Sequence, residues 1–237
     1  MNKKTILITI LIICFFLLGL LIGSNNRRIT TKTRIIKEEV KEENKKLEDI
    51  RKYENIVFLG DSITDYYPFE DIYLDLPIIN SGKAGYKTTD ILKEMDTLVY
   101  QYNPTSVFIL IGTNDFITET GEGQEKEVED NIVKIVNNIK KHRKNTKIYI
   151  QSIYPVNKSV NPSSVADRDN EEIQEVNKFL KTYCEENKYT YIDMYKYLED
   201  EDGNLMKKYT NDGLHANEIG YARISQKLLE YLYNIEV

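Results

Sequence analysis

Short apolar runs alternate with longer amphipathic stretches from residue 54 to the end of the chain. The apolar runs cover residues 56–59, 78–79, 107–111, 148–150 and 191–194. Each run is too short for a helix, rich in β-branched or aromatic residues, and nearly continuous rather than alternating. This composition is typical of strands that are covered on both faces, as in parallel sheets.

The stretches between these runs have helical periodicity and are predicted to cover 88–99, 125–142, 169–186 and 217–233. In the third of them, the residues that share one face are Ile173, Val176, Asn177, Leu180 and Cys184. Repeated strand–helix units predict an α/β protein, a three-layer α/β/α fold with a mostly parallel five-stranded sheet. Ligands of such sheets bind beyond the carboxyl ends of the strands.

The N-terminal segment differs from the rest of the chain. Residues 5–22 are eighteen uncharged positions that follow Met-Asn-Lys-Lys, long enough to cross most of a hydrocarbon core. We predict a transmembrane anchor at 5–23 after a short tail at 1–4. A cleavable signal sequence is the alternative, although Gly-Ser-Asn-Asn follows instead of an Ala-x-Ala site. Basic residues flank both ends of the span, so orientation rests on analogy with surface enzymes, which favours an external catalytic domain.

Residues 24–53 form a charged linker, which we interpret as a helical stalk because its apolar heptad pattern is short. The chain carries a net charge of −6. Since the first 53 residues carry +6, the domain at 54–237 carries −12, which disfavours nucleic acid and anionic lipid surfaces as partners. Cys14 lies in the apolar span and Cys184 in a predicted helix, so no disulfide between them is expected.

Polar motifs follow the predicted strands. They are Gly60-Asp61-Ser62-Ile63-Thr64 after the first, Asn80-Ser81-Gly82-Lys83-Ala84-Gly85 after the second, Gly112-Thr113-Asn114-Asp115 after the third, and Asp212-Gly213-Leu214-His215 after the fifth. Each motif alone is an ordinary turn sequence. Their joint placement at strand ends favours a functional site instead.

The chain has only two histidines. His142 lies in Lys-Lys-His-Arg-Lys at the end of a predicted helix, typical of a solvated cationic face. His215 follows Asp212 by three residues, and a carboxylate so close can fix the imidazole tautomer and stabilise its cation. A general-base histidine in this protein would therefore be His215.

Taken together, the four motifs resemble the blocks of the SGNH, or GDSL, hydrolase family in order and spacing, over residues 54–237. The resemblance implies a flavodoxin-like fold and a serine esterase with Ser62 as nucleophile, His215 as base and Asp212 as its partner. It also implies that the backbone N–H groups of Ser62 and Gly85 and the amide of Asn114 form the oxyanion hole. Two positions depart from the family pattern: Ile63 replaces leucine, and Tyr86 stands where aspartate is frequent.

This chemistry predicts an acyl-enzyme that water hydrolyses. Glycine suits position 85 because a side chain would crowd the carbonyl and restrict the turn. The expected substrate is an acyl ester, above all an acetyl ester, on a small molecule, a carbohydrate or a cell-envelope glycan. An O-acyltransferase, a lipase or lysophospholipase and a non-catalytic binding module remain alternatives, the last disfavoured by the intact set of residues.

No cofactor and no metal are expected. Gly85-Tyr86-Lys87-Thr88 lacks the order of a phosphate-binding loop, the acidic loop at 200–204 has its glycine at the wrong position for calcium, and the histidines and cysteines offer no zinc spacing. Four tyrosines near strand ends could stack on sugar rings, although packing is the simpler interpretation for each. They are Tyr66, Tyr67, Tyr86 and Tyr154.

Overall fold

The computed structural model describes Lys37, Lys41 and residues 55–73, 76–117 and 124–233. Chain contacts define two units, Met1–Tyr53 and Glu54–Val237, and every element below belongs to the second unit. The predicted anchor at 5–23 lies outside the described residues, as does nearly all of the predicted stalk. Within the described ranges, no helix is long and apolar enough to cross a membrane.

Five strands form one sheet in the order β2-β1-β3-β4-β5. They are β1 (Ile56–Gly60), β2 (Ile78–Gly82), β3 (Ser106–Leu110), β4 (Lys147–Gln151) and β5 (Thr190–Ile192). Every neighbouring pair is parallel, so the expected mostly parallel sheet is fully parallel over its described strands. The fifth predicted strand was too long, because Met194 already begins a helix.

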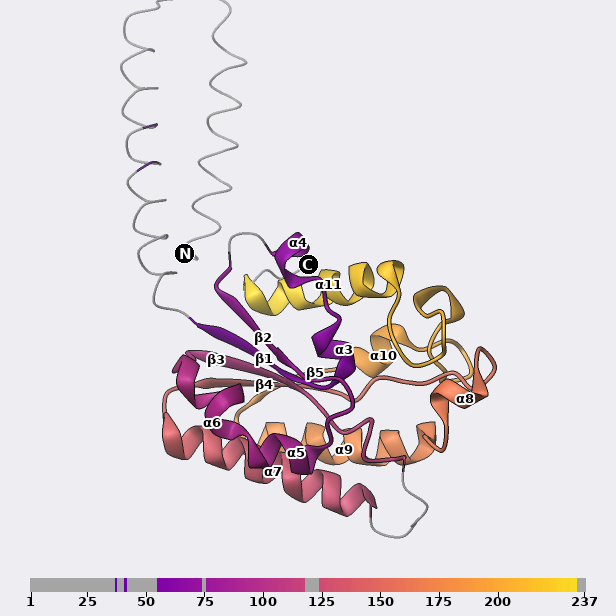
Figure 1. Cartoon of the computed structure of the whole chain (residues 1–237), viewed down its shortest axis with the longest axis horizontal. Coiled ribbons are helices and arrows are strands. Elements are labelled where there is room, and N and C mark those ends of the chain that lie inside the picture. Colours follow the sequence, from indigo (N-terminus) through magenta and orange to yellow (C-terminus); the bar gives the residue numbers. More distant parts are fainter. Residues whose placement is uncertain (1–36, 38–40, 42–54, 74–75, 118–123, 234–237) are drawn as a thin grey trace, which may run out of the picture. The chain divides into compact units, whose positions relative to one another are not determined.

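Helices cover both faces of this sheet, as Figure 1 shows. One face carries α5 (Thr88–Lys93), α6 (Met95–Leu98), α7 (Gln124–His142) and α9 (Asn170–Asn187). The other carries α3 (Ser62–Asp65), α4 (Phe69–Ile72), α10 (Met194–Leu198) and α11 (Glu218–Leu232). The remaining elements of the described residues are the short helix α8 (Pro162–Val165) and the 3₁₀ segments η2 (Tyr100–Tyr102) and η3 (Lys207–Tyr209).

The strand side chains alternate between two cores. Val57 and Leu59 pack with the α7 and α9 side, whereas Ile56 and Phe58 pack with the α11 side. Because both faces are covered, both sets are apolar, which explains the nearly continuous hydrophobic runs in the sequence. The three-layer prediction is therefore confirmed.

Two helix predictions have different outcomes. The buried positions of α9 include Asn177 and the four apolar residues expected on its inner face. The Asn177 amide is satisfied there, accepting from the N–H of Ile153 at 2.7 Å and donating to its carbonyl at 2.9 Å. The single helix expected at 88–99 was wrong, because the backbone leaves the helical region at Glu94 (φ −118°, ψ 24°) and divides it into α5 and α6.

Candidate active site

Ser62 lies at the carboxyl end of β1, on the first turn of α3. The side chain of Asp61 caps this turn by accepting the N–H of Ile63 at 2.9 Å. A strand that passes directly into a capped helix holds the following hydroxyl at the edge of the sheet. Ser62 is 6% exposed, so its hydroxyl faces a largely enclosed position.

The structure brings Ser62, His215 and Asp212 into one hydrogen-bonded chain. Ser62 Oγ lies 2.9 Å from His215 Nε2, and His215 Nδ1 lies 2.7 Å from Asp212 Oδ2. A carboxylate can only accept, so the Nδ1 proton is directed at Asp212 and Nε2 is left to accept the serine proton. This geometry suits a serine activated by a general base.

The loop that carries the histidine is organised by the Asp212 carboxylate. Its Oδ1 accepts the N–H groups of Leu214 at 2.9 Å and His215 at 2.8 Å. Burial tends to raise the pKa of Asp212, but the His215 ring N–H and these two backbone donors outweigh burial, and the net pKa is lowered. Gly213 adopts φ +81° between them, a conformation that favours glycine.

The second motif is fastened to the helix that carries the serine. Asn80 donates to the carbonyl of Asp65 at 3.1 Å and accepts the N–H of Gly82 at 2.9 Å. The Asp65 carboxylate in turn accepts the N–H of Ala84 at 3.2 Å. These bonds hold the loop after β2 against α3, next to Ser62.

Gly85 ends this loop with φ +80°. A methyl group built there would meet no protein atom within 4 Å. The protein itself thus leaves room for a side chain at this position, and the left-handed backbone agrees with the expectation that the turn requires glycine.

Asn114 has both ends of its amide engaged. Its Nδ2 donates to the carbonyl of Tyr86 at 3.0 Å, and its Oδ1 accepts from Arg168 at 2.7 Å. The nitrogen keeps a second N–H. Over the described part of the chain, the backbone N–H groups of Ser62 and Gly85 donate to no other residue. The three predicted oxyanion donors thus follow β1, β2 and β3, which are neighbours in the sheet.

Two carboxyl groups neighbour the serine and asparagine in sequence, the half-buried Asp115 and the buried Asp61. Asp115 accepts the backbone N–H of Thr88 at 3.1 Å and its hydroxyl at 2.5 Å, and burial raises the pKa of Asp115. Burial likewise raises the pKa of Asp61 to about 7, with the charge of Arg168 opposing the rise. Asp115 thereby ties the third motif to the start of α5, directly after the Gly85 loop.

Arg168 is the residue of this site that sequence reasoning missed. It is 2% exposed and contacts both Thr113 and Asn114. In the sequence it stands between Asp167 and Asp169, a pattern typical of a solvated surface. No local signal distinguishes it from the other basic residues.

The four tyrosines near the strand ends differ in their burial and in their contacts. Tyr67 and Tyr154 are buried in the core, which supports the packing interpretation for them. The hydroxyl of Tyr86 donates to Glu94 at 2.8 Å. Tyr66 is 56% exposed, and its ring centroid lies 5.5 Å from that of His215.

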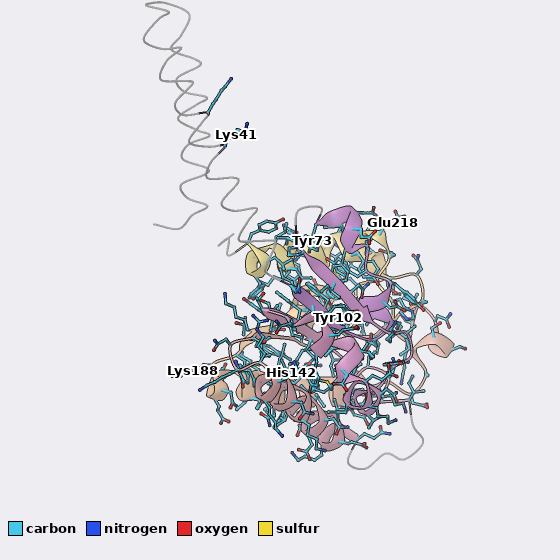
Figure 2. All side chains as sticks on the ribbon, turned by 60° about the vertical axis from the view of Figure 1, so that its left-hand side comes forward. Lys41, Tyr73, Tyr102, His142, Lys188 and Glu218 are labelled. Atoms are coloured by element: carbon cyan, nitrogen blue, oxygen red, sulfur yellow. The ribbon has the colours of Figure 1, made fainter. Side chains whose placement is uncertain are left out.

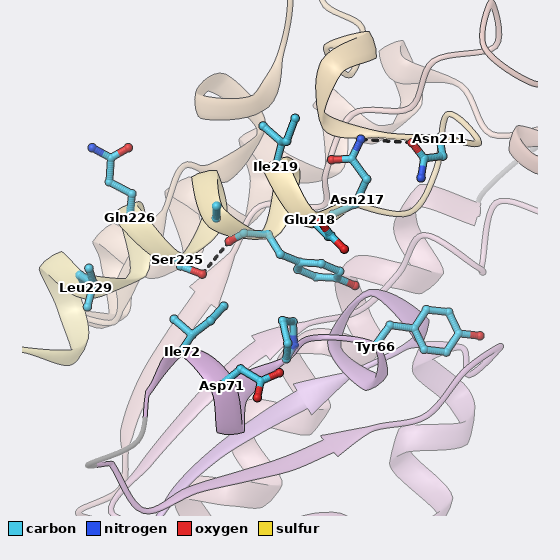
Figure 3. Close-up of a pocket in the computed structure, with 14 residues that line it drawn as sticks. Tyr66, Asp71, Ile72, Asn211, Asn217, Glu218, Ile219, Ser225, Gln226 and Leu229 are labelled. Carbon is cyan, nitrogen blue, oxygen red and sulfur yellow. Dashed lines mark hydrogen bonds between the residues drawn. The ribbon is translucent and has the colours of Figure 1, made fainter.

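Tyr66 also lines a groove of about 1080 Å³ between α4 and α11, whose lining extends along α11 as far as Leu229. Ile72 of α4, Ile219 of α11 and Asn211 of the preceding loop are among its lining residues (Figure 3). Asn211 and Ala216, which bracket the Asp212–His215 loop, belong to its lining. The groove therefore begins on the histidine side of the candidate site.

The second histidine is remote from this site. His142 ends α7 as an exposed residue, and its ring stacks on Tyr100 with centroids 4.1 Å apart. β4 begins five residues later, so His142 lies at the edge where the strands begin (Figure 2).

The acidic segment at 200–204 forms a turn. Asp200 Oδ1 accepts the N–H groups of Asp202 at 3.0 Å and Asn204 at 2.9 Å. Across the described ranges, no cluster of three or more His, Cys, Asp or Glu side chains could hold a metal ion.

Comparison with known proteins identifies relatives at three levels. A model of the GDSL-like lipase/acylhydrolase family matches residues 58–223. The N-acylneuraminate cytidylyltransferase of Escherichia coli O18:K1:H7 is 30% identical over 189 residues, which are 79% of this chain but 42% of that protein. The chain therefore spans less than half of that relative.

Among solved structures, a Streptococcus pneumonia protein described in connection with platelet activating factor is 30% identical, with a TM-score of 0.68 over 89% of this chain and 100% of its own. A GDSL-like lipase of Bacteroides thetaiotaomicron is 24% identical, with a TM-score of 0.69 over 77% and 89%. A catalytic mutant of an acetylxylan esterase from Geobacillus stearothermophilus is 18% identical, with a TM-score of 0.58 over 75% and 93%. The last two likenesses concern the fold alone.

Proposed function

Because the chain belongs to the GDSL-like lipase/acylhydrolase family of enzymes, we propose that it is a serine esterase that removes acetyl groups from a carbohydrate through Ser62, His215 and Asp212. The observation that carries the proposal is the chain of hydrogen bonds at 2.9 Å and 2.7 Å through the His215 ring.

In the proposed first step, Ser62 Oγ attacks the ester carbonyl carbon while His215 Nε2 takes the hydroxyl proton. The carbonyl π electrons move to oxygen, and the oxyanion accepts hydrogen bonds from the N–H groups of Ser62 and Gly85 and from Asn114. Collapse of this intermediate breaks the bond to the alcohol, which receives the proton from His215. Water then repeats the sequence on the acyl-enzyme and releases the acid.

The groove supports a sugar as the alcohol portion of the substrate. Because His215 hands its proton to the leaving oxygen, the alcohol portion must lie on the histidine side, where the groove begins. Its lining combines the exposed Tyr66 ring with the polar side chains of Asn211 and Glu218. Sugar rings offer an apolar face to aromatic rings and hydroxyl groups to amides and carboxylates.

Two further observations support a short acyl group on a substrate without negative charge. The large apolar side chains exposed within the described ranges are Tyr66, Ile72, Ile117 and Ile219. Three of them line the groove, which we assign to the alcohol, and are therefore not available to bind a long acyl chain. The charge of −12 over residues 54–237 opposes anionic lipid surfaces. The acetylxylan esterase relative adds a precedent for acetyl transfer to water on this fold.

The test is a p-nitrophenyl ester series from acetate to palmitate, together with acetylated and deacetylated xylo-oligosaccharides, on the full chain and its Ser62→Ala variant. We expect the highest kcat/KM with acetate, acetate release from the acetylated sugar, and loss of both in Ser62→Ala. Faster turnover of palmitate would indicate a lipase. Consumption of the acetyl donor that rises sharply with added sugar, with acetylation of that sugar, would indicate an acyltransferase.

We also propose that residues 5–23 anchor the enzyme in a membrane with the catalytic domain outside. The eighteen uncharged positions support the anchor. Protease added to intact protoplasts should degrade the catalytic domain in the membrane fraction. Protection until lysis would place the domain inside, and recovery of the domain from the medium would indicate cleavage.

A further inference from the structure

A single buried guanidinium braces the loop that carries the proposed oxyanion donor. Arg168 lies between α8 and α9 and is 2% exposed. Its Nε donates to the carbonyl of Thr113 at 2.8 Å, and its Nη2 donates to Asn114 Oδ1 at 2.7 Å. Its Nη1 donates to the carbonyls of Val165 at 2.9 Å and Ser164 at 3.3 Å.

These contacts determine which end of the Asn114 amide can face a substrate. An amide has an oxygen end and a nitrogen end of nearly equal shape, so rotation by half a turn would place the oxygen where an oxyanion must bind. A cation on Oδ1 favours one orientation only. The Nδ2 bond to the Tyr86 carbonyl at 3.0 Å then fixes the direction of the remaining N–H.

The charge of the guanidinium adds to this effect. Burial lowers the pKa of Arg168, while the carboxylates of Asp61 and Asp212 oppose that shift, and an arginine side chain stays protonated in proteins. A cation bound to the amide oxygen draws electron density away from the nitrogen, and hydrogen-bonded chains strengthen one another in this way. The free N–H of Asn114 becomes a better donor to an oxyanion.

We propose that Arg168 is a positioning residue of the oxyanion hole, which holds the Asn114 amide with its N–H directed at the developing negative charge. This inference rests on the proposed esterase function and adds a residue to its machinery. Arg168 acts through Asn114 and does not itself contact the reacting atoms.

The main test is a double-mutant cycle on kcat with p-nitrophenyl acetate. Arg168→Gln should lower kcat on the order of 10- to 100-fold with little change in KM, somewhat less than the loss of a whole oxyanion donor. In the Asn114→Ala background, Arg168→Gln should cost less than about threefold, because its target is already gone. Losses that multiply in the double variant would overturn the proposal.

Asn170→Ala is the matched control. Asn170 lies two residues after Arg168 in the sequence. Its Oδ1 accepts the N–H of Val156 and its Nδ2 donates to the carbonyl of Val156, both at 2.9 Å, and neither group bonds to Asn114. Its loss should lower the melting temperature, while its effect on kcat should multiply with that of Asn114→Ala. Equal coupling of Asn170 and Arg168 to Asn114 would mean general softening of the fold and would refute a specific role.

If Arg168→Gln does not fold, Arg168→Lys tests the positioning role of Arg168 in its place. Lysine keeps the buried charge but lacks the planar fork that reaches Thr113 and Asn114 together. We expect a folded protein with a reduced kcat and the same lack of additivity with Asn114→Ala. Full activity of Arg168→Lys would refute positioning. Full activity of Ser62→Ala or Asn114→Ala would instead refute the proposed esterase function itself. This result differs from full activity of Arg168→Lys, which would refute the positioning role alone.

Discussion

The two sides of the candidate site are held in place in different ways. On the histidine side, the contacts are local: Asp212 binds the ring and the backbone of His215 three residues away. On the oxyanion side, the Asn114 amide is held by Tyr86, 28 residues away, and by Arg168, 54 residues away. The His215 ring is therefore oriented by a residue of its own loop, whereas the Asn114 amide is oriented only by residues that folding brings to it.

This difference predicts different responses to substitution. In the histidine loop, each side chain combines a chemical role with the shape of its own loop. At the oxyanion side, residues far apart in the sequence should behave as one unit, because each orients the next. Coupling is expected on both sides, because Asp212 acts through His215 and Arg168 acts through Asn114, but on the oxyanion side it joins residues far apart in the sequence.

The largest effect is expected from His215→Ala. His215 is the side chain that the described part of the chain places in hydrogen-bond contact with Ser62 Oγ, so kcat should fall by about 10⁴-fold or more. His142→Ala is the matched control, since that histidine is exposed at the end of α7, and it should keep wild-type kcat. Steady-state kinetics on both proteins, with thermal melts, make the comparison. Substantial turnover in His215→Ala would remove the basis for the triad.

Asp212→Ala should retain on the order of 10 to 100 times more activity than His215→Ala, because Asp212 orients and stabilises the imidazole without taking the serine proton. It should also destabilise the loop. The folded pKa of Asp212 is lowered, so its carboxylate stabilises the fold at neutral pH, and this contribution is lost as the pH falls through 3.8 and then through the folded pKa.

Urea unfolding at pH 7 and at acid pH checks the stability part of this prediction. The gap between wild type and Asp212→Ala should shrink on acidification. An unchanged gap would mean that the loop does not depend on the ionised carboxylate.

Asn114→Ala should lower kcat on the order of 100- to 1000-fold, the usual cost of one oxyanion donor. Asn177→Ala is its control, because both amides are 6% exposed and bind backbone groups. Asn177 lies on α9, away from the donors, and its loss should reduce the unfolding free energy while sparing kcat. Equal kinetic losses in the two variants would contradict a specific role for Asn114.

The same contrast explains what the sequence could predict. The strands were predictable because both sheet faces are buried, and the motifs because strand ends coincide at one edge. The pairing of Asp212 with His215 was predictable because only three residues separate them. Arg168 was not, since its role depends on a guanidinium that meets the Asn114 loop only in the fold. The break at Glu94 was missed because the apolar spacing continues from α5 into α6.

The smallest effect on turnover is expected from Asp61→Asn. Asp61 directly precedes Ser62, the residue that belongs to both the histidine side and the oxyanion side of the site. Asparagine caps a helix about as well as aspartate, so the bond to the N–H of Ile63 can persist and Ser62 should stay in place. Within the described ranges, Asp61 Oδ2 is buried without a hydrogen-bond partner. We expect kcat to change by less than about tenfold, since the cap survives.

Stability should respond more clearly than turnover, and with a defined dependence on pH. The pKa of Asp61 rises from 3.8 to about 7 because burial disfavours the charged form. Below pH 3.8 the Asp61 carboxyl is protonated in both the folded and the unfolded chain. Between 3.8 and about 7 the unfolded chain ionises while the folded protein does not, so wild-type stability falls. The loss is complete above that range and is on the order of 4 kcal/mol.

Asp61→Asn carries no such charge, so its stability relative to wild type should increase as the pH rises from 4 to 7 and then level off. Subtracting the wild-type curve removes the contributions that Asp115 and Asp212 make to both proteins. Guanidinium unfolding midpoints at pH 4, 5, 6, 7 and 8 measure this difference. A difference independent of pH would mean that Asp61 is ionised in the folded protein. With its pKa raised to about 7, by contrast, the Asp61 carboxyl is protonated at pH 5 and charged at pH 8. Since the positive charge of Arg168 stabilises the charged form, Arg168→Gln should then destabilise the fold more at pH 8 than at pH 5.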